Sequence, residues 1–330
     1  MEAGLVQRAV PGISFAAIPA AGVHGVGLRA LPPNLLHLAQ GVLASRRILQ
    51  DFKPDVLFFT GGYVAAPMAV AGSRIPSLLY VPDIEPGLAL KFLAGYASRV
   101  AVTAEDSRRY FNRPASIVTV TGYPVRSELS AWTAESAKAH FHLDDQLPVL
   151  LVFGGSKGAR SINQAITGSL PQLLEMAQVI HITGQLDWEA VETAQAILPQ
   201  EFKDRYHAFP YLHEDMGAAL ACASLSISRA GASSLGELPL FGVPAILVPY
   251  PYAWRYQKVN ADYLVRQNAA VMLEDAALKD RLVSTVRGLF EQPARLQAMA
   301  GAMRAQARPQ AAGQIASMLE ELANRGGKKW

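Results

Sequence analysis

The chain alternates short runs of apolar, β-branched and aromatic residues with longer segments of helical periodicity. The clearest runs are residues 55–60 (DVLFFT), 77–81 (SLLYV), 148–153 (PVLLVF) and 225–228 (LSIS). Continuous apolar runs of this length are typical of parallel strands covered by helices on both faces. The alternation therefore predicts an α/β fold built on doubly wound parallel sheets.

The alternation restarts once, after the sequence GYPVR at residues 122–126, where glycine and proline interrupt both periodicities. A chain of 330 residues is long enough for two domains. We therefore expect a first domain over residues 1–124, a second over 125–330, and a hinge near 122–127. The first predicted strand, residues 14–18 (SFAAI), follows a helical fragment, although a nucleotide-binding domain of this type usually opens with a strand and a glycine-rich turn.

The composition excludes several classes of protein. Hydrophobic residues make up 51% and charged residues 17%, which excludes global disorder. The single cysteine, Cys222, excludes a disulfide framework and a cysteine zinc cluster. A net charge of +3 is too small to argue for nucleic acid. Without a long apolar stretch or a secretory signal pattern, the sequence predicts a cytoplasmic protein, with the possibility of affinity for a membrane surface.

Two glycine-rich turns stand between a predicted strand and a predicted helix. They are residues 154–160 (GGSKGAR) and 228–237 (SRAGASSLGE). Glycines permit tight turns, and the free N–H groups and dipole of a helix start favour an anion such as phosphate. Ser156, Lys157 and Arg160 add a hydroxyl and positive charge. Neither turn is a Walker or GxGxxG motif, so plain tight turns are the alternative.

Three further segments carry polar groups of the kind that bind sugars or phosphates. Glu237 lies in the helix after the second turn, where a carboxylate can accept bonds from a ribose diol. Gln257 and Asn260, three residues apart, share one helical face. The Gly61-Gly62 turn ends a strand at the sheet edge where α/β proteins bind ligands. The alternatives are a surface glutamate, helix capping and a simple chain reversal.

Together these segments resemble glycosyltransferase family 28, which has the GT-B fold of two Rossmann-like domains with a cleft between them. The closest resemblance is to the family members that make lipid II. The segments that carry it follow the family order along the chain: MEAGLV, GGYVAAP, GYPVR, GGSKGARSIN, YLHEDM, SRAGASSLGE, GVPAILVPY and QKVNA. Each segment is weakly specific, but the combination is specific.

The resemblance implies an inverting hexosyltransferase. Its donor is UDP-N-acetylglucosamine, and its acceptor is a polyprenyl-diphosphate-linked N-acetylmuramyl-pentapeptide, so that lipid I becomes lipid II in peptidoglycan synthesis. It also implies that the enzyme needs no metal or cofactor. Such an enzyme works as a peripheral protein at the cytoplasmic face of the cell membrane, on an anionic membrane surface, and it binds no nucleic acid.

The same resemblance assigns residues to the two substrates. By motif position, the donor-binding residues are Ser156, Asn163, Leu212, Arg229, Gly231, Ala232, Glu237, Gln257 and Asn260. Within this set Glu237 would hold the ribose, Leu212 would present backbone to uracil, and Gln257 and Asn260 would contact the sugar. Gly61, Gly62 and Tyr63 would lie on the acceptor side.

Three departures from the family pattern create alternatives. The family's opening strand and GGTGGH-like loop have no counterpart, so we expect an incomplete N-terminal domain, from a late start or a fragment. Asp83 stands where the family has an asparagine, and we take its carboxylate as the candidate catalytic base. Tyr256 replaces a glutamine near the donor sugar. A UDP-glucose- or UDP-galactose-dependent diacylglycerol transferase, and a UDP-sugar-binding fragment without activity, therefore remain open.

Apolar residues beside arginines indicate a membrane-facing surface. Residues 28–31 (LRAL) and 35–38 (LLHL) precede Arg46 and Arg47. An apolar surface with a basic rim suits an anionic bilayer. An amphipathic helix packed on the sheet is the alternative.

Overall fold

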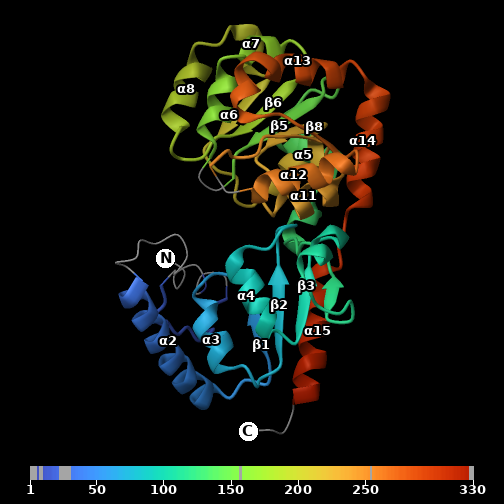
Figure 1. The fold of residues 1–330 in the computed structure, drawn as a ribbon. Helices are drawn as coiled ribbons and strands as arrows, with labels where there is room; N and C mark the ends of the chain where they lie inside the picture. Colours follow the sequence, from blue (N-terminus) through green and yellow to red (C-terminus); the bar gives the residue numbers. More distant parts are fainter. Residues whose placement is uncertain (1–5, 7–9, 22–30, 156–157, 253–254, 327–330) are drawn as a thin grey trace.

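The computed structural model describes residues 6, 10–21, 31–155, 158–252 and 255–326. Two α/β lobes follow one another along the chain, each around one parallel sheet (Figure 1). The strands of the first sheet lie between residues 57 and 120, and the strands of the second lie between residues 149 and 272. The predicted fold class, two doubly wound parallel domains, is confirmed.

The first sheet has four parallel strands in the order β1-β2-β3-β4. Its central strand β2 (Ser77–Val81) is buried along its whole length, as its continuous apolar sequence predicts. The other strands are β1 (Leu57–Phe59), β3 (Arg99–Val102) and β4 (Val118–Val120). The helices of this lobe are α2 (Leu31–Phe52), α3 (Ala65–Ala71), α4 (Leu88–Tyr96) and the short 3₁₀ helix η2 (Glu105–Tyr110).

The strand predicted over residues 14–18 is wrong, because this segment is irregular and mostly exposed. Phe15 keeps 45% of its surface exposed. A strand needs a neighbouring edge to satisfy its backbone groups, and these residues pair with no strand of the described chain. The segment instead passes α2 at Gly41, where a Cβ would collide with the Pro19 carbonyl oxygen.

The second sheet has six parallel strands in the order β10-β9-β8-β5-β6-β7. The order reverses between β5 (Val149–Phe153) and β8 (Leu225–Ser228), which creates the switch point where doubly wound sheets bind ligands. The remaining strands are β6 (Gln178–Ile182), β7 (Tyr206–Phe209), β9 (Ala245–Leu247) and β10 (Ala270–Met272). The strand β10 was not predicted from the sequence.

Helices cover both faces of the second sheet. The chain after β5 forms two short helices in succession, with Gly168 at the end of the first and Pro171 in the first turn of the second. The helices of the lobe are α6 (Arg160–Thr167), α7 (Leu170–Leu174), α8 (Trp188–Ala196), α9 (Gln200–Lys203), α10 (Met216–Cys222), α11 (Ser234–Phe241), α12 (Tyr256–Arg266), η4 (Asp275–Ala277), α13 (Leu278–Phe290) and α14 (Pro293–Ala305).

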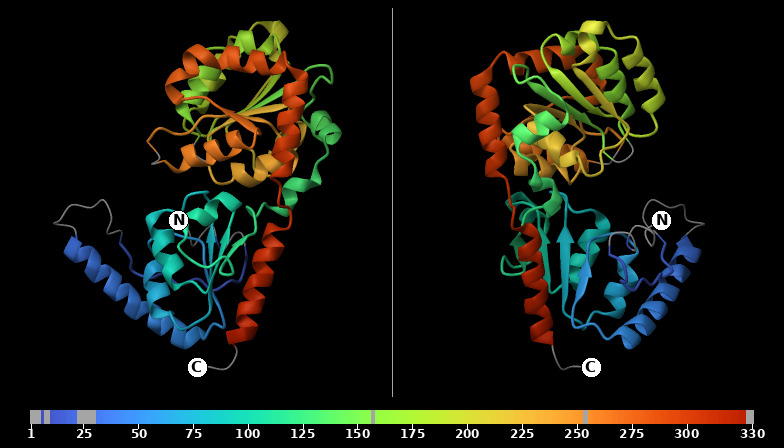
Figure 2. Two further views of the ribbon diagram at one scale, coloured as in Figure 1. Left: turned by 45° about the vertical axis from the view of Figure 1, so that its right-hand side comes forward. Right: turned by 180° about the vertical axis from the view of Figure 1, so that it is seen from behind.

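The chain crosses between the lobes twice. It first passes through η3 (Ser127–Ala131) and α5 (Ala134–His140), and it returns through the last helix, α15 (Ala311–Gly326), beside the first sheet (Figure 2). Ile315, Met318 and Leu322 of α15 join the buried cluster of β2 and β3. The division between residues 124 and 125 stays a prediction, and α15 belongs by its packing to the first sheet.

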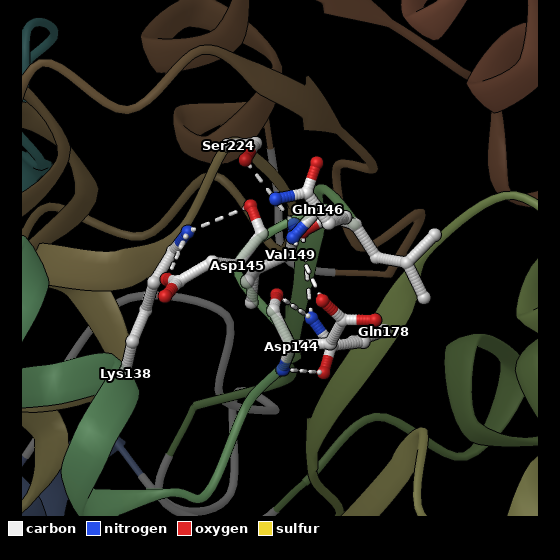
Figure 3. Close-up of polar contacts among 8 residues, drawn as sticks. Lys138, Asp144, Asp145, Gln146, Val149, Gln178 and Ser224 are labelled. Carbon is white, nitrogen blue, oxygen red and sulfur yellow. Dashed lines mark hydrogen bonds and ion pairs between the residues drawn. The ribbon is translucent and has the colours of Figure 1, made fainter.

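Hydrogen bonds also fix the amino-terminal edge of the second sheet (Figure 3). The buried Gln178 amide accepts from the Asp144 N–H at 2.7 Å and donates to the Asp144 carbonyl at 2.8 Å. The Val149 N–H donates to the Ser224 hydroxyl at 3.1 Å. These contacts hold the start of β5, so its opposite, carboxyl-terminal end is positioned at the switch point.

Candidate functional site

A cavity of about 930 Å³ opens at the carboxyl ends of β5, β8 and β9. It brings together three segments that the sequence analysis singled out, all at the switch point of the second sheet. Its walls include Phe153, Gly154, Gly155 and Gly158 of the first turn, Arg229, Gly231 and Ser233 of the second, and Tyr250, Tyr252 and Gln257 of the third.

The first turn needs glycine for its path. Gly155 and Gly158 have φ values of 94° and 77°, in the region that L-residues rarely adopt. A Cβ on Gly158 would strike the Thr183 carbonyl, and the Gly158 N–H donates to the Gly155 carbonyl at 2.9 Å. The predicted donor residue Ser156 lies outside the described residues.

The second turn presents backbone at the start of α11. Helical bonding begins with the Ser234 N–H, which donates to the Gly231 carbonyl at 3.1 Å. The N–H groups just before this point are those that a helix start offers to an anion. Open space lies where a Cβ of Gly231 would stand. Gly231 lines the cavity, whereas Ala232 is half-buried in the same turn and does not line it.

Arg229 lines the cavity with its charge already paired. Its guanidinium contacts the Asp275 carboxylate at 2.5 Å and donates to the Ser161 hydroxyl at 2.8 Å. It also lies 5.2 Å from the Tyr250 ring centroid. The network ties together the segments that follow β5, β8, β9 and β10. Asp275 and Ser161 were missed by the sequence analysis, and the apolar run before Asp275 is the signal that could have revealed the final strand.

Asn163 is buried behind the first turn and does not line the large cavity. Its Nδ2 donates to the Thr183 carbonyl at 2.8 Å and to the Asp187 carboxylate at 2.9 Å. Its Oδ1 accepts from His181 Nε2 at 3.0 Å, so Nδ1 accepts from the Tyr206 hydroxyl at 2.8 Å. Burial lowers the pKa of His181 to about 3 and keeps the ring neutral. Asn163 instead lines a neighbouring cavity of about 500 Å³ between α6 and α8.

Two predicted donor residues lie away from the cavity walls. Glu237 is half-buried; burial raises its pKa, while the charge of Arg126 and a hydrogen bond with Ser233 oppose that shift. Its neighbour Gly236 packs so closely on the hinge that a Cβ would meet Tyr123. Leu212 is 8% exposed and belongs to a hydrophobic core cluster.

Gln257 and Asn260 share one face of α12, as predicted, but have different partners. Gln257 lines the cavity, and its Oε1 accepts from the Tyr250 N–H at 2.8 Å. Asn260 is 1% exposed and accepts from the Ile84 N–H at 3.0 Å. Its Nδ2 donates to the Asp83 carboxylate at 2.8 Å and to the Ala230 carbonyl at 3.1 Å. Asn260 therefore joins the second turn to the first lobe.

Asp83 lies on the first lobe, in the loop that follows β2. Burial raises the pKa of its carboxyl, and the hydrogen bond from Asn260 opposes that shift. Nearer the start of the chain, Gly61 and Gly62 have φ values of 123° and 80° just after β1, and Tyr63 is 53% exposed. None of these four residues lines the large cavity.

Metal-ligating groups do not gather in the part of the chain that the structure describes. There, no set of three or more His, Cys, Asp or Glu side chains is placed to hold a metal ion. Both arginines that line the cavity among the described residues are paired, since Arg160 contacts Asp187 at 3.0 Å and Arg229 contacts Asp275.

Comparison with known sequences gives matches over most of the chain. The glycosyltransferase family 28 N-terminal domain matches residues 3–102, and the glycosyltransferase family 28 C-terminal domain matches residues 149–315. A protein of Roseiflexus sp. (strain RS-1) is 41% identical over 98% of this chain and 81% of its own length. A protein of Desulforudis audaxviator is 36% identical over 98% of this chain and 89% of its own length. Both are named UDP-N-acetylglucosamine–N-acetylmuramyl-(pentapeptide) pyrophosphoryl-undecaprenol N-acetylglucosamine transferase.

Comparison with solved structures supports the fold. The crystal structure of Acinetobacter baumannii MurG has a TM-score of 0.75, with 24% identity over 97% of this chain and 88% of that one. The Staphylococcus aureus MnaA–UDP structure has a TM-score of 0.66, with 13% identity over 87% of this chain and 81% of that one.

Proposed function

The chain belongs to glycosyltransferase family 28, and we propose that it transfers N-acetylglucosamine from UDP-N-acetylglucosamine to a lipid-linked acceptor. The acceptor is the polyprenyl-diphosphate N-acetylmuramyl-pentapeptide of peptidoglycan synthesis, as in the names of the relatives. The product is lipid II, and the enzyme is a hexosyltransferase.

One observation carries this proposal within the fold: two glycine turns from separate βα units line a single cavity at the switch point. Backbone N–H groups at helix starts can hold a diphosphate without a free side-chain cation. The ion pair of Arg229 with Asp275 supports binding of the diphosphate by backbone groups, because the charge of Arg229 is already compensated. We therefore assign the diphosphate of the donor to these turns, with Gly231 at its closest approach.

The donor's other contacts are assigned with the same reasoning. Gln257 lines the cavity and reads the sugar, while Tyr250 and Tyr252, whose ring centroids lie 5.6 Å apart, form an aromatic wall. Glu237 binds the ribose only if it rotates toward the cavity that its neighbour Ser233 lines. Asn163 supports the first turn from behind, through its bonds to Thr183 and Asp187.

Asp83 is the proposed general base. The acceptor hydroxyl attacks the anomeric carbon, its proton passes to the Asp83 carboxylate, and UDP departs with the electrons of the broken bond. This single displacement inverts the configuration. The bond from Asn260 occupies Asp83 Oδ1, so Oδ2 is the atom that takes the proton. Gly61, Gly62 and Tyr63 border the acceptor side of the same lobe.

A membrane surface is proposed on α2. Leu36 and Leu43 are 60% and 59% exposed, and because they lie about two helical turns apart they share a face of α2. Arg46 and Arg47 are exposed further along the same helix. No helix among the described residues has the length and apolarity to cross a bilayer. We propose peripheral attachment to anionic lipid at the cytoplasmic face through this side of α2.

The test is a transfer assay with the purified chain. UDP-N-acetylglucosamine and a lipid I analogue should give a disaccharide-linked lipid and UDP in equal amounts. Parallel reactions with UDP-glucose, UDP-galactose and diacylglycerol should give far less product. Transfer only in the diacylglycerol reactions would overturn the assignment, and UDP binding without any transfer would reduce the chain to a UDP-sugar-binding protein.

A further inference from the structure

The loop between β2 and α4 contacts the other lobe through four of its residues. Asp83 and Ile84 bond with Asn260, as described above. The Glu85 carboxylate accepts from Arg255 Nε at 2.7 Å and from Arg255 Nη2 at 2.5 Å. A Cβ on Gly87 would lie 3.1 Å from the Tyr256 hydroxyl. One short loop of the first lobe is thus held by the amino-terminal half of α12 and by Arg255, the residue before it.

The ion pair at the centre of this contact is asymmetric. Only 5% of the Glu85 side chain is exposed, whereas 64% of the Arg255 side chain is exposed. Lys91, on the same lobe as Glu85, approaches the same carboxylate at 3.8 Å. A buried carboxylate is costly unless it is paired and hydrogen-bonded, and Arg255 supplies two bonds in the bidentate geometry. Separation of the lobes therefore removes most of the compensation that Glu85 has in the joined state.

The proposed base, Asp83, lies in the same loop as Glu85. Asp83 is two residues away, and its carboxylate is oriented by Asn260, whose amide is already bonded to Ile84 and Ala230. Both N–H groups of Asn260 are in use, so the amide cannot rotate without breaking contacts on both lobes. The position of Asp83 relative to the donor cavity consequently depends on the loop staying docked.

We propose that Glu85 and Arg255 form a latch between the lobes and act as positioning residues that hold Asp83 in place for transfer. This inference rests on the proposed function of Asp83 as the base. The latch acts on the reaction step and leaves the donor cavity unchanged, because neither Glu85 nor Arg255 lines that cavity.

The chain offers a matched control. Arg266, at the other end of α12, contacts Asp106 of the first lobe at 2.7 Å and is 48% exposed. It forms an ion pair between the same two lobes but does not touch the loop that carries Asp83. Arg255→Gln and Arg266→Gln therefore each remove one such ion pair, and only the first releases the loop.

The first measurement needs no substrate. Hydrogen exchange of the Ile84 amide, which donates to Asn260, should be at least about tenfold faster in Arg255→Gln than in the wild type. Arg266→Gln should leave that exchange unchanged, and Arg255→Lys should restore part of the protection. Equal exchange in the wild type and Arg255→Gln would overturn the latch, as would an equal rise in both glutamine variants.

The second measurement separates positioning from binding. Arg255→Gln and Glu85→Gln should each lower kcat about tenfold while the donor KM changes less than about twofold. Arg266→Gln should keep the kcat of the wild type. Unchanged kcat in both latch variants would contradict the positioning role. If the wild type transfers no sugar but Arg255→Gln still frees the Ile84 amide, the proposed function fails while the contact between the lobes stands.

Discussion

Both sheets bury central strands along their whole length, β2 in the first lobe and β5 and β8 in the second, but the edge strand β1 of the first sheet leaves Phe58 44% exposed. The six strands of the second sheet provide a switch point with a cavity at the turns that follow β5, β8 and β9. The four strands of the first sheet provide a loop that docks on α12 of the other lobe. The position of the cavity follows from the strand order of the second sheet. The position of the Asp83 loop depends on the contact between the lobes.

This difference assigns the two chemical tasks to the two lobes. In the proposed function, the second lobe binds the donor through turns at the carboxyl ends of its strands. The proposed base lies on a loop of the first lobe that is held by a few polar bonds to α12. Substitutions on the loop should therefore reduce turnover, and substitutions in the cavity should reduce donor binding.

The largest expected effect is at Asp83. Asp83→Asn removes the proton acceptor and should lower kcat by about 10²–10⁴-fold, because that is the usual contribution of general base catalysis. UDP affinity, measured by calorimetry, should stay within about twofold of the wild type. Loss of UDP binding with normal turnover of saturating donor would reverse the roles of the two lobes.

The same residue predicts a pH dependence. Burial raises the pKa of Asp83, so its carboxylate becomes protonated at a higher pH than an ordinary aspartate. The kcat of the wild type should fall on the acidic side with an inflection above the usual range of aspartate. In Asp83→Asn the residual rate should lack that inflection, and an unchanged acidic limb would remove Asp83 from the proton transfer.

At the cavity, Arg229→Met tests the compensated charge. It leaves Asp275, whose side chain is 21% exposed, without its ion-pair partner, and should cost about 2–3 kcal/mol of unfolding free energy in urea titration. The double variant Arg229→Met/Asp275→Leu should regain most of that loss. If the single variant is as stable as the wild type, Arg229 is free to bind ligand and the proposed division of charge is wrong.

His181 gives an effect on the stability of the second lobe that is graded with pH. Its pKa in the folded chain is about 3, below the 6.5 of an ordinary histidine, so only the unfolded chain binds this proton between those pH values. The contribution of His181 to the free energy of unfolding is fully present above about pH 6.5. Below that pH it falls by about 1.4 kcal/mol per pH unit, down to about pH 3. We expect denaturant titrations across this range to give an unfolding free energy that depends less steeply on pH in His181→Gln than in the wild type. The same pH dependence in both proteins would contradict the neutral buried imidazole.

The smallest expected effect is at the outer face of the first lobe. Leu36→Ser should weaken binding to anionic vesicles at low salt severalfold, because one exposed apolar side chain is lost from the surface. Ile197→Ser removes an apolar side chain that is 80% exposed on the second lobe, and should leave vesicle binding unchanged. An equal loss of vesicle binding in both variants would show that α2 is not the membrane contact.

Sequence alone predicted the elements whose burial is complete. The strand over residues 225–228 has the predicted bounds, since both of its faces are covered and its run is uniformly apolar or small. It failed where pairing decides the outcome: residues 14–18 have a β-type composition but no neighbouring strand in the described chain, and β10 is a three-residue edge.

The site was predicted where backbone makes it and missed where side chains bond across the fold. The glycine turns converge as expected because strand order dictates it. Asn163 and Asn260 stay predictions as donor contacts, and in the structure both amides bond to other residues of the protein. Glu85 and Arg255 are 170 residues apart, and no local pattern reports such a contact.

The central claim is that the cavity between the two glycine turns holds the uridine diphosphate. Gly231→Leu tests it directly, because the added side chain enters open space at the cavity wall and can leave the fold intact. Gly313→Leu, at an exposed position of α15 with equal room, is the control. In titration calorimetry the wild type and the control should bind UDP with the same affinity, while Gly231→Leu, equally stable to heat, should give no binding heat. Undiminished UDP binding by a folded Gly231→Leu chain would contradict the account.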